Sequence, residues 1–349
     1  MNRKKLIAFS ISLAMTVVPV TPAAAAGAEQ NTEGLQNAVL DLEFENSLED
    51  SSGKGNNGTL SSGEAEYVDG VVGKGLKMNG SSYVNLGNST DLQPENLTLS
   101  FWIRPDSDMK GEELISWNKN EWYTDGWYLS SENDNTPLTL SVGPAKTNGQ
   151  PYRVSVSGKR SEFLPTGEWT HIAVTYDKDS KEICFYRNGV KCSTVTTYGI
   201  SGESTGVLGS DATMEKSIGY NGPKYKGAYL KASLDEYQLY NDVATPEEVI
   251  ALYEESGQTF DRKAVAQADL DKISIPETTQ ENLSLPTTGE SGSVISWSSD
   301  NEAMVAADGT VVRPGVGEKD VTVTLTAEAS YLNGEKVTKT YKVTVTAKQ

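Results

Sequence analysis

The chain has 349 residues, of which 37% are hydrophobic, 8% aromatic and 22% charged, a length that suggests about two domains, each able to bury a core. Asp and Glu total 48 against 30 Lys and Arg, which gives a formal net charge of −18. That charge repels phosphate backbones and anionic lipid heads, so it disfavours nucleic acid as a partner and suits a neutral partner such as a glycan. With one His and two Cys, a Cys/His zinc site is disfavoured as well.

Residues 1–26 have the pattern of a secretory signal. A basic start is followed by a short apolar run, Leu6–Val20, and by the small residues Ala24 and Ala26 of a cleavage site. The run is too short and too broken by proline to span a membrane comfortably. We therefore expect residues 27–349 to be exported as a secreted, extracellular protein with no membrane span.

Most of the exported chain alternates apolar and polar residues over short runs bounded by Gly, Asn, Asp and Ser, the pattern of half-buried β-strands. Such runs occur at Leu40–Phe44, Leu97–Ile103, Ile172–Tyr176 and Ile183–Phe185. A helix follows, because Thr245 can cap it, Pro246 can begin it and Glu248 can complete a capping box. After a short linker at 27–36, many antiparallel strands thus predict a two-sheet sandwich over 37–256, with the helix as its lid.

Residues 257–349 have a different sequence pattern, a short helix followed by Thr- and Val-rich strands, and are interpreted as a second domain. Asp261–Lys272 predicts a short helix, and Asn333-Gly334 predicts a hairpin turn. The predicted Thr- and Val-rich strands are Val294–Trp297, Thr310–Val312, Val321–Ala327 and Tyr341–Val345. This pattern favours a smaller immunoglobulin-like β-sandwich without the paired cysteines of antibody domains, so the whole chain is predicted to be all-β.

Cys184 and Cys192 lie on either side of a predicted hairpin at Arg187-Asn188-Gly189. If all three residues form the loop, the two cysteines fall directly opposite each other, and a disulfide is expected in an exported protein. If only Asn188 and Gly189 form the loop, the register shifts and both thiols stay free.

Four segments, in chain order, resemble those of LamG-like domains, which are concanavalin A-type jelly rolls. They are Leu48–Gly58, Ser100–Ile103, Gly167–Val174 and Leu234–Asn241. The resemblance covers about residues 37–256 and implies a concanavalin A-like two-sheet jelly roll.

Residues 261–347 resemble the bacterial immunoglobulin-like modules that are appended to secreted plant-polysaccharide hydrolases. The stretches that carry this resemblance are Leu283–Pro286, Ile295–Ser299 and Asp308–Val311. In such proteins this pair of modules accompanies a catalytic domain, often one that acts on arabinose-, xylose- or galactose-containing polymers. The resemblance therefore implies a polysaccharide of that kind as the partner.

The jelly-roll resemblance also implies that the first and last strands lie close together, which would bring Asp50 near Asp235. Asp50 lies in a Gly/Asn/Ser-rich turn whose carbonyl groups can converge on a cation, and calcium prefers such oxygen ligands. We expect Asp50 and Asp235 to share one structural Ca²⁺, with Glu43 or Glu45 as a further ligand. The alternative is that Asp50 caps its turn and Asp235 accepts backbone hydrogen bonds.

Sugar rings present apolar faces, so glycan sites combine exposed aromatic platforms with polar groups. The segment 117–128 mixes several aromatic side chains with amides and carboxylates, whereas its Trp127 continues into an apparent strand and is expected in the core. We expect carbohydrate binding at Trp117, Trp122, Tyr123, Tyr152, Arg153, Tyr220 and Tyr225, with Trp122 and Tyr123 as the exposed platform.

Catalysis within this chain is not expected. A glycosidase needs two carboxylates across the scissile bond, whereas Asp235 and Glu236 are adjacent and point to opposite faces of a strand. His171 lies in a strand beside Trp169, which is typical of a structural imidazole. We therefore expect a monomeric, non-catalytic carbohydrate-binding protein whose immunoglobulin-like domain is a spacer. Two alternatives stay open: an adhesion or scaffold protein that binds protein partners, and the N-terminal part of a glycoside hydrolase whose catalytic domain is absent from this sequence.

Overall fold

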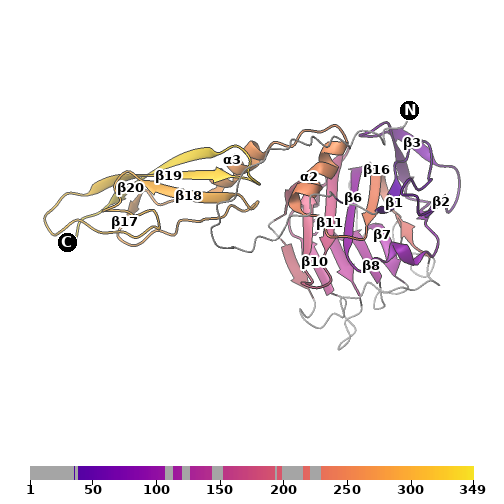
Figure 1. The fold of residues 1–349 in the computed structure, drawn as a ribbon, viewed down its shortest axis with the longest axis horizontal. Helices are drawn as coiled ribbons and strands as arrows, with labels where there is room; N and C mark the ends of the chain where they lie inside the picture. Colours follow the sequence, from indigo (N-terminus) through magenta and orange to yellow (C-terminus); the bar gives the residue numbers. More distant parts are fainter. Residues whose placement is uncertain are drawn as a thin grey trace, which may run out of the picture. The chain divides into compact units, whose positions relative to one another are not determined.

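The computed structural model describes residue 35 and residues 38–106, 113–119, 126–143, 152–192, 195–198, 215–220 and 229–349. These residues form two sheets that share one core and, later in the chain, a small four-stranded sheet with a helix (Figure 1). The predicted fold class, an all-β jelly roll plus a smaller immunoglobulin-like domain, is confirmed. The predicted signal and linker, residues 1–26 and 27–36, lie outside the described residues apart from residue 35.

Within the described residues, the first sheet has eight strands, and its neighbours pair antiparallel. In spatial order these are β13 (Val190–Lys191), β12 (Ile183–Arg187), β11 (Thr170–Tyr176), β6 (Leu97–Pro105), β16 (Lys231–Tyr240), β4 (Lys74–Asn79) and β3 (Glu66–Asp69), with β1 (Ala38–Leu42) also paired to β16. The first and last strands of the jelly roll therefore lie side by side, as the resemblance implies, with Leu42 opposite Tyr237.

The second sheet also has eight strands in the described part of the chain. In spatial order these are β14 (Val195–Tyr198), β10 (Tyr152–Val156), β9 (Thr139–Val142), β8 (Gly126–Ser131), β7 (Glu113–Lys119), β15 (Ser217–Ile218), β5 (Val84–Asn85) and β2 (Thr59–Leu60). Two short helical segments, η1 (Thr90–Leu92) and α1 (Arg160–Phe163), connect strands.

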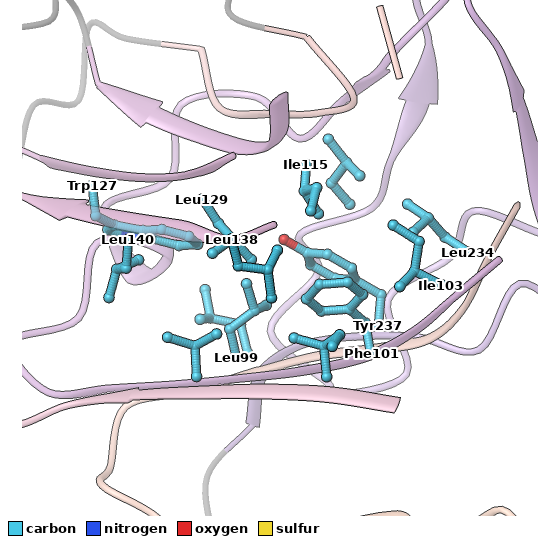
Figure 2. Close-up of a cluster of buried hydrophobic side chains, with 14 of the residues drawn as sticks. Leu99, Phe101, Ile103, Ile115, Trp127, Leu129, Leu138, Leu140, Leu234 and Tyr237 are labelled. Carbon is cyan, nitrogen blue, oxygen red and sulfur yellow. The ribbon is translucent and has the colours of Figure 1, made fainter. Parts of the chain in front are cut away.

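The core lies between the two sheets and fixes which face of each strand points outward. Leu99 and Phe101 of β6 share this core with Trp127 and Leu129 of β8, and all four side chains are fully buried (Figure 2). Because successive side chains of a strand point to opposite faces, Tyr128 lies on the outer face of the second sheet. The interpretation of Trp127 as a core residue is confirmed.

Helix α2 (Pro246–Glu255) begins as the sequence predicts. The Thr245 side chain accepts a hydrogen bond from the Glu248 backbone N–H, and the Glu248 carboxylate accepts one from the Thr245 N–H, which completes the capping box. Val249 of the helix packs with Ala173 and Tyr186 on the outer face of the first sheet (Figure 1). The helix is therefore part of the jelly-roll domain.

The predicted disulfide between Cys184 and Cys192 is wrong, because the hairpin loop has two residues rather than three. Asn188 and Gly189 both have positive φ, 49° and 79°, as a type I′ turn requires. Cys192 therefore pairs with Phe185, to whose carbonyl its N–H donates at 2.8 Å. The Cys184 side chain packs beneath α2, whereas that of Cys192 packs against the core between the sheets. Two free thiols on opposite faces of one sheet cannot be joined.

The C-terminal domain is built on a single sheet with strand order β17 (Thr278–Thr279), β20 (Val337–Val345), β19 (Val321–Ser330) and β18 (Val294–Ser299). Helix α3 (Arg262–Lys272) begins at Asp261, whose carboxylate accepts the Ala264 N–H at 2.9 Å. Ala266 and Leu270 of α3 share a hydrophobic cluster with residues of β19 and β20, so the helix covers one face of the sheet.

Two details of this domain differ from the predictions. The predicted strand Thr310–Val312 is reduced to one isolated bridge, Val305 with Val311. The connection from β19 to β20 runs from residue 331 to 336, longer than a tight Asn-Gly hairpin, with Leu332 and Asn333 at positive φ. None of the helices among the described residues is long and apolar enough to cross a membrane.

Candidate functional site

The outer face of the second sheet carries a row of aromatic and polar side chains. Trp117 of β7 pairs with Tyr128 of β8, Tyr128 with Ser141 of β9, and Ser141 with Arg153 of β10, so the four residues form one rung across four strands. The rings of Trp117 and Tyr128 stack with their centroids 5.4 Å apart at an interplanar angle of 27°. Two residues predicted to bind carbohydrate, Trp117 and Arg153, are thus brought to one face of one sheet.

The aromatic side chains of this rung are buried rather than exposed to solvent. Trp117 is 2% exposed and Tyr128 is 1% exposed, so neither ring forms an exposed platform. The hydroxyl groups of Ser130 and Ser141 are buried, and neither has a hydrogen-bond partner within the part of the chain that the structure describes. Buried hydroxyls are normally paired, so this face holds unused hydrogen-bonding capacity.

A second aromatic group lies at the β5–β15 end of the same sheet. Tyr83 stacks on Tyr220 with centroids 5.1 Å apart, and Tyr220 stacks on Tyr229 at 4.4 Å with the planes within 7°. We call these three residues the tyrosine stack. Its central ring, Tyr220, is 7% exposed, whereas the outer rings are only half-buried. Their outer surfaces are therefore accessible to a ligand.

The tyrosine stack adjoins the rung through β15. Ser217 pairs with Trp117 on one side and with Asn85 on the other, and its hydroxyl donates to the Tyr220 carbonyl at 2.5 Å. Burial, together with the nearby Glu215 carboxylate and the Tyr229 phenol, raises the pKa of Tyr83. Its phenol is thus a neutral hydrogen-bond donor over the physiological range.

The other predicted carbohydrate-binding residues are distributed differently. The ring of Tyr152 packs against the core between the sheets. Trp122, Tyr123 and Tyr225 lie outside the described residues. Sequence reasoning did not single out Tyr83 and Tyr229, because nothing in either local sequence indicates that both approach Tyr220.

The Asp50 carboxylate is held by donors of its own turn and of β1. It accepts hydrogen bonds from the backbone N–H groups of Asp41, Ser52 and Asn56 at 3.0, 2.9 and 2.8 Å, and from the Ser52 hydroxyl at 2.8 Å. Burial acts to raise the pKa of Asp50, but these hydrogen bonds, led by the Ser52 hydroxyl, lower it below its usual value.

The Asp235 carboxylate has a separate set of donors. Its Oδ2 accepts from the backbone N–H groups of Val71 and Val72 at 2.7 and 3.0 Å, and its Oδ1 accepts from the Glu236 N–H at 3.1 Å. The side chain is fully buried, which raises its pKa to about 6. Asp235 therefore fixes the turn between β3 and β4.

These hydrogen bonds follow the alternative stated for Asp50 and Asp235, in which the carboxylates serve their own backbone surroundings. The Glu43 side chain is half-buried and acts electrostatically on Glu236. Among the described residues, no three His, Cys, Asp or Glu side chains are grouped so that they could hold a metal ion. A Ca²⁺ shared by Asp50, Asp235 and Glu43 stays a prediction.

Calcium binding itself stays a prediction. Excess EGTA is expected to lower the thermal unfolding midpoint of protein prepared with calcium, because an ion that binds only the folded state stabilises it by mass action. EGTA saturated with excess calcium serves as the control for the chelator. An unchanged midpoint would contradict the prediction of a structural calcium ion.

Comparison with known families agrees with this architecture. Residues 78–250 match the concanavalin A-like lectin/glucanases superfamily, and residues 263–348 match the atrophied bacterial Ig domain. A search of curated proteins finds no match. Strand β1 precedes the first matched segment and yet pairs with β16 inside it.

Three solved structures illustrate the similarity to other proteins. Domain 4 of AbnA, a GH43 extracellular arabinanase from Geobacillus stearothermophilus, solved with arabinotriose, is 22% identical, with 63% of this chain and 100% of that chain covered and a TM-score of 0.46. The binding domain of Paraclostridial Mosquitocidal Protein 1 is 17% identical, with 86% and 82% covered and a TM-score of 0.49. The binding domain of botulinum neurotoxin DC, solved with rat synaptotagmin II, is 13% identical, with 86% and 73% covered and a TM-score of 0.47. Because every TM-score is below 0.5, these similarities carry no conclusion about the ligand of this chain.

The family matches and the sheets identify both domains. The first matched segment lies within the two eight-stranded sheets that enclose one core. The second matched segment contains the strands of the four-stranded sheet. Residues 78–250 therefore belong to the concanavalin A-like lectin/glucanase superfamily, and residues 263–348 to the atrophied bacterial Ig domains.

Proposed function

We propose that the jelly-roll domain binds a polysaccharide without cleaving it, and that the tyrosine stack is the principal contact. The observation that carries this proposal is the stacking of Tyr83, Tyr220 and Tyr229 with the outer rings half-buried. Sugar rings present apolar C–H faces that pack on such rings, while the phenol hydroxyls bond sugar hydroxyls. The Ig-like domain then acts as a spacer.

The rung of Trp117, Tyr128, Ser141 and Arg153 adjoins the tyrosine stack, but its two rings and Ser141 are buried, so the tyrosine stack alone is proposed as the contact surface. Ser217 links the tyrosine stack to Trp117, and Ser141 and Arg153 continue the row across the sheet. The formal net charge of −18 favours a neutral glycan over an acidic one.

Affinity electrophoresis in gels that contain arabinan, xylan, galactan or mannan tests the proposal. The protein is expected to be retarded in at least one gel, and Tyr83→Ala and Tyr229→Ala are each expected to weaken retardation about three- to tenfold, the effect of one lost ring. Tyr83→Phe keeps the stacking surface and loses only the hydroxyl, so it should bind more tightly than Tyr83→Ala but less tightly than the wild type. Tyr152→Ala, on the core side of the same sheet, is the matched control.

Absence of retardation in every gel would contradict glycan binding and favour the adhesion or scaffold alternative. Retardation that survives both Ala substitutions would place the contact elsewhere. Release of reducing ends from the retained polysaccharide would contradict the non-catalytic part of the proposal.

We also propose that the protein is exported. The support is the signal-like pattern of residues 1–26, which lies outside the described residues. Detection of the protein, with its N-terminus at residue 27, in the medium of the producing cells would support export. Retention of the uncleaved chain inside the cells would contradict it.

A further inference from the structure

An open cleft lies in the C-terminal domain, where the chain that leads into β17 approaches β20. Its volume is about 550 Å³, within the range of about 300–1,000 Å³ that is usual for ligand pockets. The residues that line it include Ile275 and Glu277, which precede β17, and Tyr341 and Lys342 of β20. The cleft lies in a different domain from the tyrosine stack, so the proposed function leaves it without a role.

Strand β17 covers only the last part of β20 (Figure 1). Thr278 pairs with Thr344 in parallel, and the Thr344 N–H donates to the Glu277 carbonyl at 2.8 Å. Within the described stretch 229–349, no backbone hydrogen bond joins Ile275 or Glu277 to Lys342, although all three residues line the cleft. The chain before β17 therefore diverges from β20 and leaves the cleft between them.

The remaining part of this edge of β20 presents unpaired backbone groups. Alternate residues of a strand direct their N–H and C=O groups to opposite sides, so those of Thr338, Thr340 and Lys342 point to one side. It is the side of Thr344, whose N–H reaches Glu277 rather than β19. Within residues 229–349, these backbone groups have no hydrogen-bond partner on that side. An unpaired strand edge is a template for the addition of another strand.

This edge is held in an extended conformation by β19 and by α3. Backbone pairing with β19 runs along the whole of β20. The Tyr341 hydroxyl and the Lys339 ammonium group both donate to the Leu270 carbonyl of α3, at 3.0 and 3.1 Å. Because β20 is already ordered, an added strand loses its own freedom but orders little of this domain, which favours binding.

The charges on β20 favour an acidic partner. The strand contains Lys339 and Lys342 and no acidic residue, in a chain whose formal net charge is −18. The Lys339 ammonium group lies 3.3 Å from the Asp271 carboxylate, whereas the exposed Lys342 has no ion pair within residues 229–349. Glu277 lines the cleft at its β17 end. An acidic side chain is therefore favoured beside Lys342 and disfavoured beside Glu277.

The two faces of the sheet differ at β20, and this difference sets the pattern of side chains that fits the edge. Tyr341 lies on the face that α3 covers, and Ile275 packs against a hydrophobic cluster of the same face. Lys342 follows Tyr341 and so points to the opposite face. A strand added here would direct apolar side chains toward Tyr341 and Ile275 and acidic side chains toward the face of Lys342.

We propose that the open edge of β20 is a docking site for an extended, acidic segment of another protein, which adds to the sheet as a further strand. The backbone of the segment pairs with the free N–H and C=O groups of Thr338, Thr340 and Lys342, which supplies affinity. The alternation of acidic and apolar side chains along the segment supplies specificity. The Ig-like domain thereby has a binding role in addition to its role as a spacer.

Fluorescence anisotropy of a labelled synthetic peptide of alternating Glu and Val residues, titrated with the full chain, tests the docking site. We expect a dissociation constant below about 1 mM, and binding about tenfold weaker for a peptide of alternating Lys and Val residues. Binding of the Glu–Val peptide should weaken as salt is added, because salt screens exposed charges. Bound peptide should also slow hydrogen exchange of amides 338–342.

Thr340→Pro is the most informative variant. The Thr340 N–H points away from β19, so proline removes a donor from the open edge and no hydrogen bond from the pairing with β19. Peptide affinity is expected to fall about tenfold, whereas Thr340→Val, which keeps the N–H, should bind as the wild type. Lys342→Glu should weaken binding about three- to tenfold. Lys319→Glu, at an exposed lysine outside the cleft lining, is its matched control.

Absence of binding at about 1 mM peptide would overturn the proposal, and so would wild-type affinity in both Thr340→Pro and Lys342→Glu. If Thr340→Pro does not fold, wild-type affinity in Lys342→Glu alone is decisive. A concentration-dependent dimer that Thr340→Pro abolishes would assign the edge to a second copy of the chain and would equally overturn the proposal. Retardation in the polysaccharide gels should be the same for Thr340→Pro and the wild type, so this proposal and the proposed function fail separately.

Discussion

Asp235→Ala is expected to lower the free energy of unfolding by about 3–5 kcal/mol, because it leaves the N–H groups of Val71, Val72 and Glu236 without their acceptor. The carboxylate is fully buried, so water does not replace it without a rearrangement of the turn. The turn also approaches so closely that a Cβ on Gly70 would collide with the carboxylate. We therefore expect stability to depend strongly on the Asp235 side chain.

Urea unfolding at pH 7.5, where Asp235 is ionised, measures this effect. Asp235→Asn keeps one acceptor oxygen and should cost less than Asp235→Ala. Asp69→Ala is the control, since the Asp69 side chain is 93% exposed and solvent screens its ion pair with Lys74, so stability should change little. A loss below about 1 kcal/mol for Asp235→Ala would show that the turn is not held as described.

Trp127→Ala is expected to cost about 3–5 kcal/mol, the range for removal of a large aromatic side chain from a close-packed core. Trp127 is fully buried between the sheets (Figure 2). Its indole N–H donates to the Leu92 carbonyl at 3.3 Å, which ties β8 to the segment before β6. The substitution therefore removes packing and leaves one buried carbonyl unpaired.

Thermal or urea unfolding of Trp127→Ala measures this loss of stability, with Trp169→Ala as the control. Trp169 is only half-buried and stacks under Arg104 at 4.8 Å, so its removal should cost clearly less. Trp127→Phe should fall between the two because it keeps part of the volume. Equal losses for Trp127→Ala and Trp169→Ala would contradict the central place of Trp127 in the core.

The fold was predictable because local rules decide it. The alternation in β6 places Leu99 and Phe101 in the core without reference to any other strand, and the capping box at Thr245 sets the start of α2 from three neighbouring residues. The hairpin that joins the strands of Cys184 and Cys192 shows that such local patterns do not always determine the length of a loop. A loop of two residues rather than three moved one thiol to the opposite face, and the local sequence allowed both.

The candidate site was only partly predictable because it joins distant segments. Tyr220 was named from a local mixture of aromatic and polar residues, but Tyr83 and Tyr229 matter only because β5 pairs with β15. Trp117 and Arg153 were named separately, and their common rung follows from three strand registers. Two of the three donors of Asp235, the N–H groups of Val71 and Val72, lie 164 and 163 positions earlier in the chain.

The most direct test of glycan binding compares hydrogen exchange of the full chain with and without the polysaccharide that retards it in the gels. We expect added glycan to slow exchange in residues 80–86, 215–220 and 229–231, which carry the tyrosine stack, and to leave residues 263–348 unchanged. A footprint confined to the first sheet or to the Ig-like domain would contradict this account of the site.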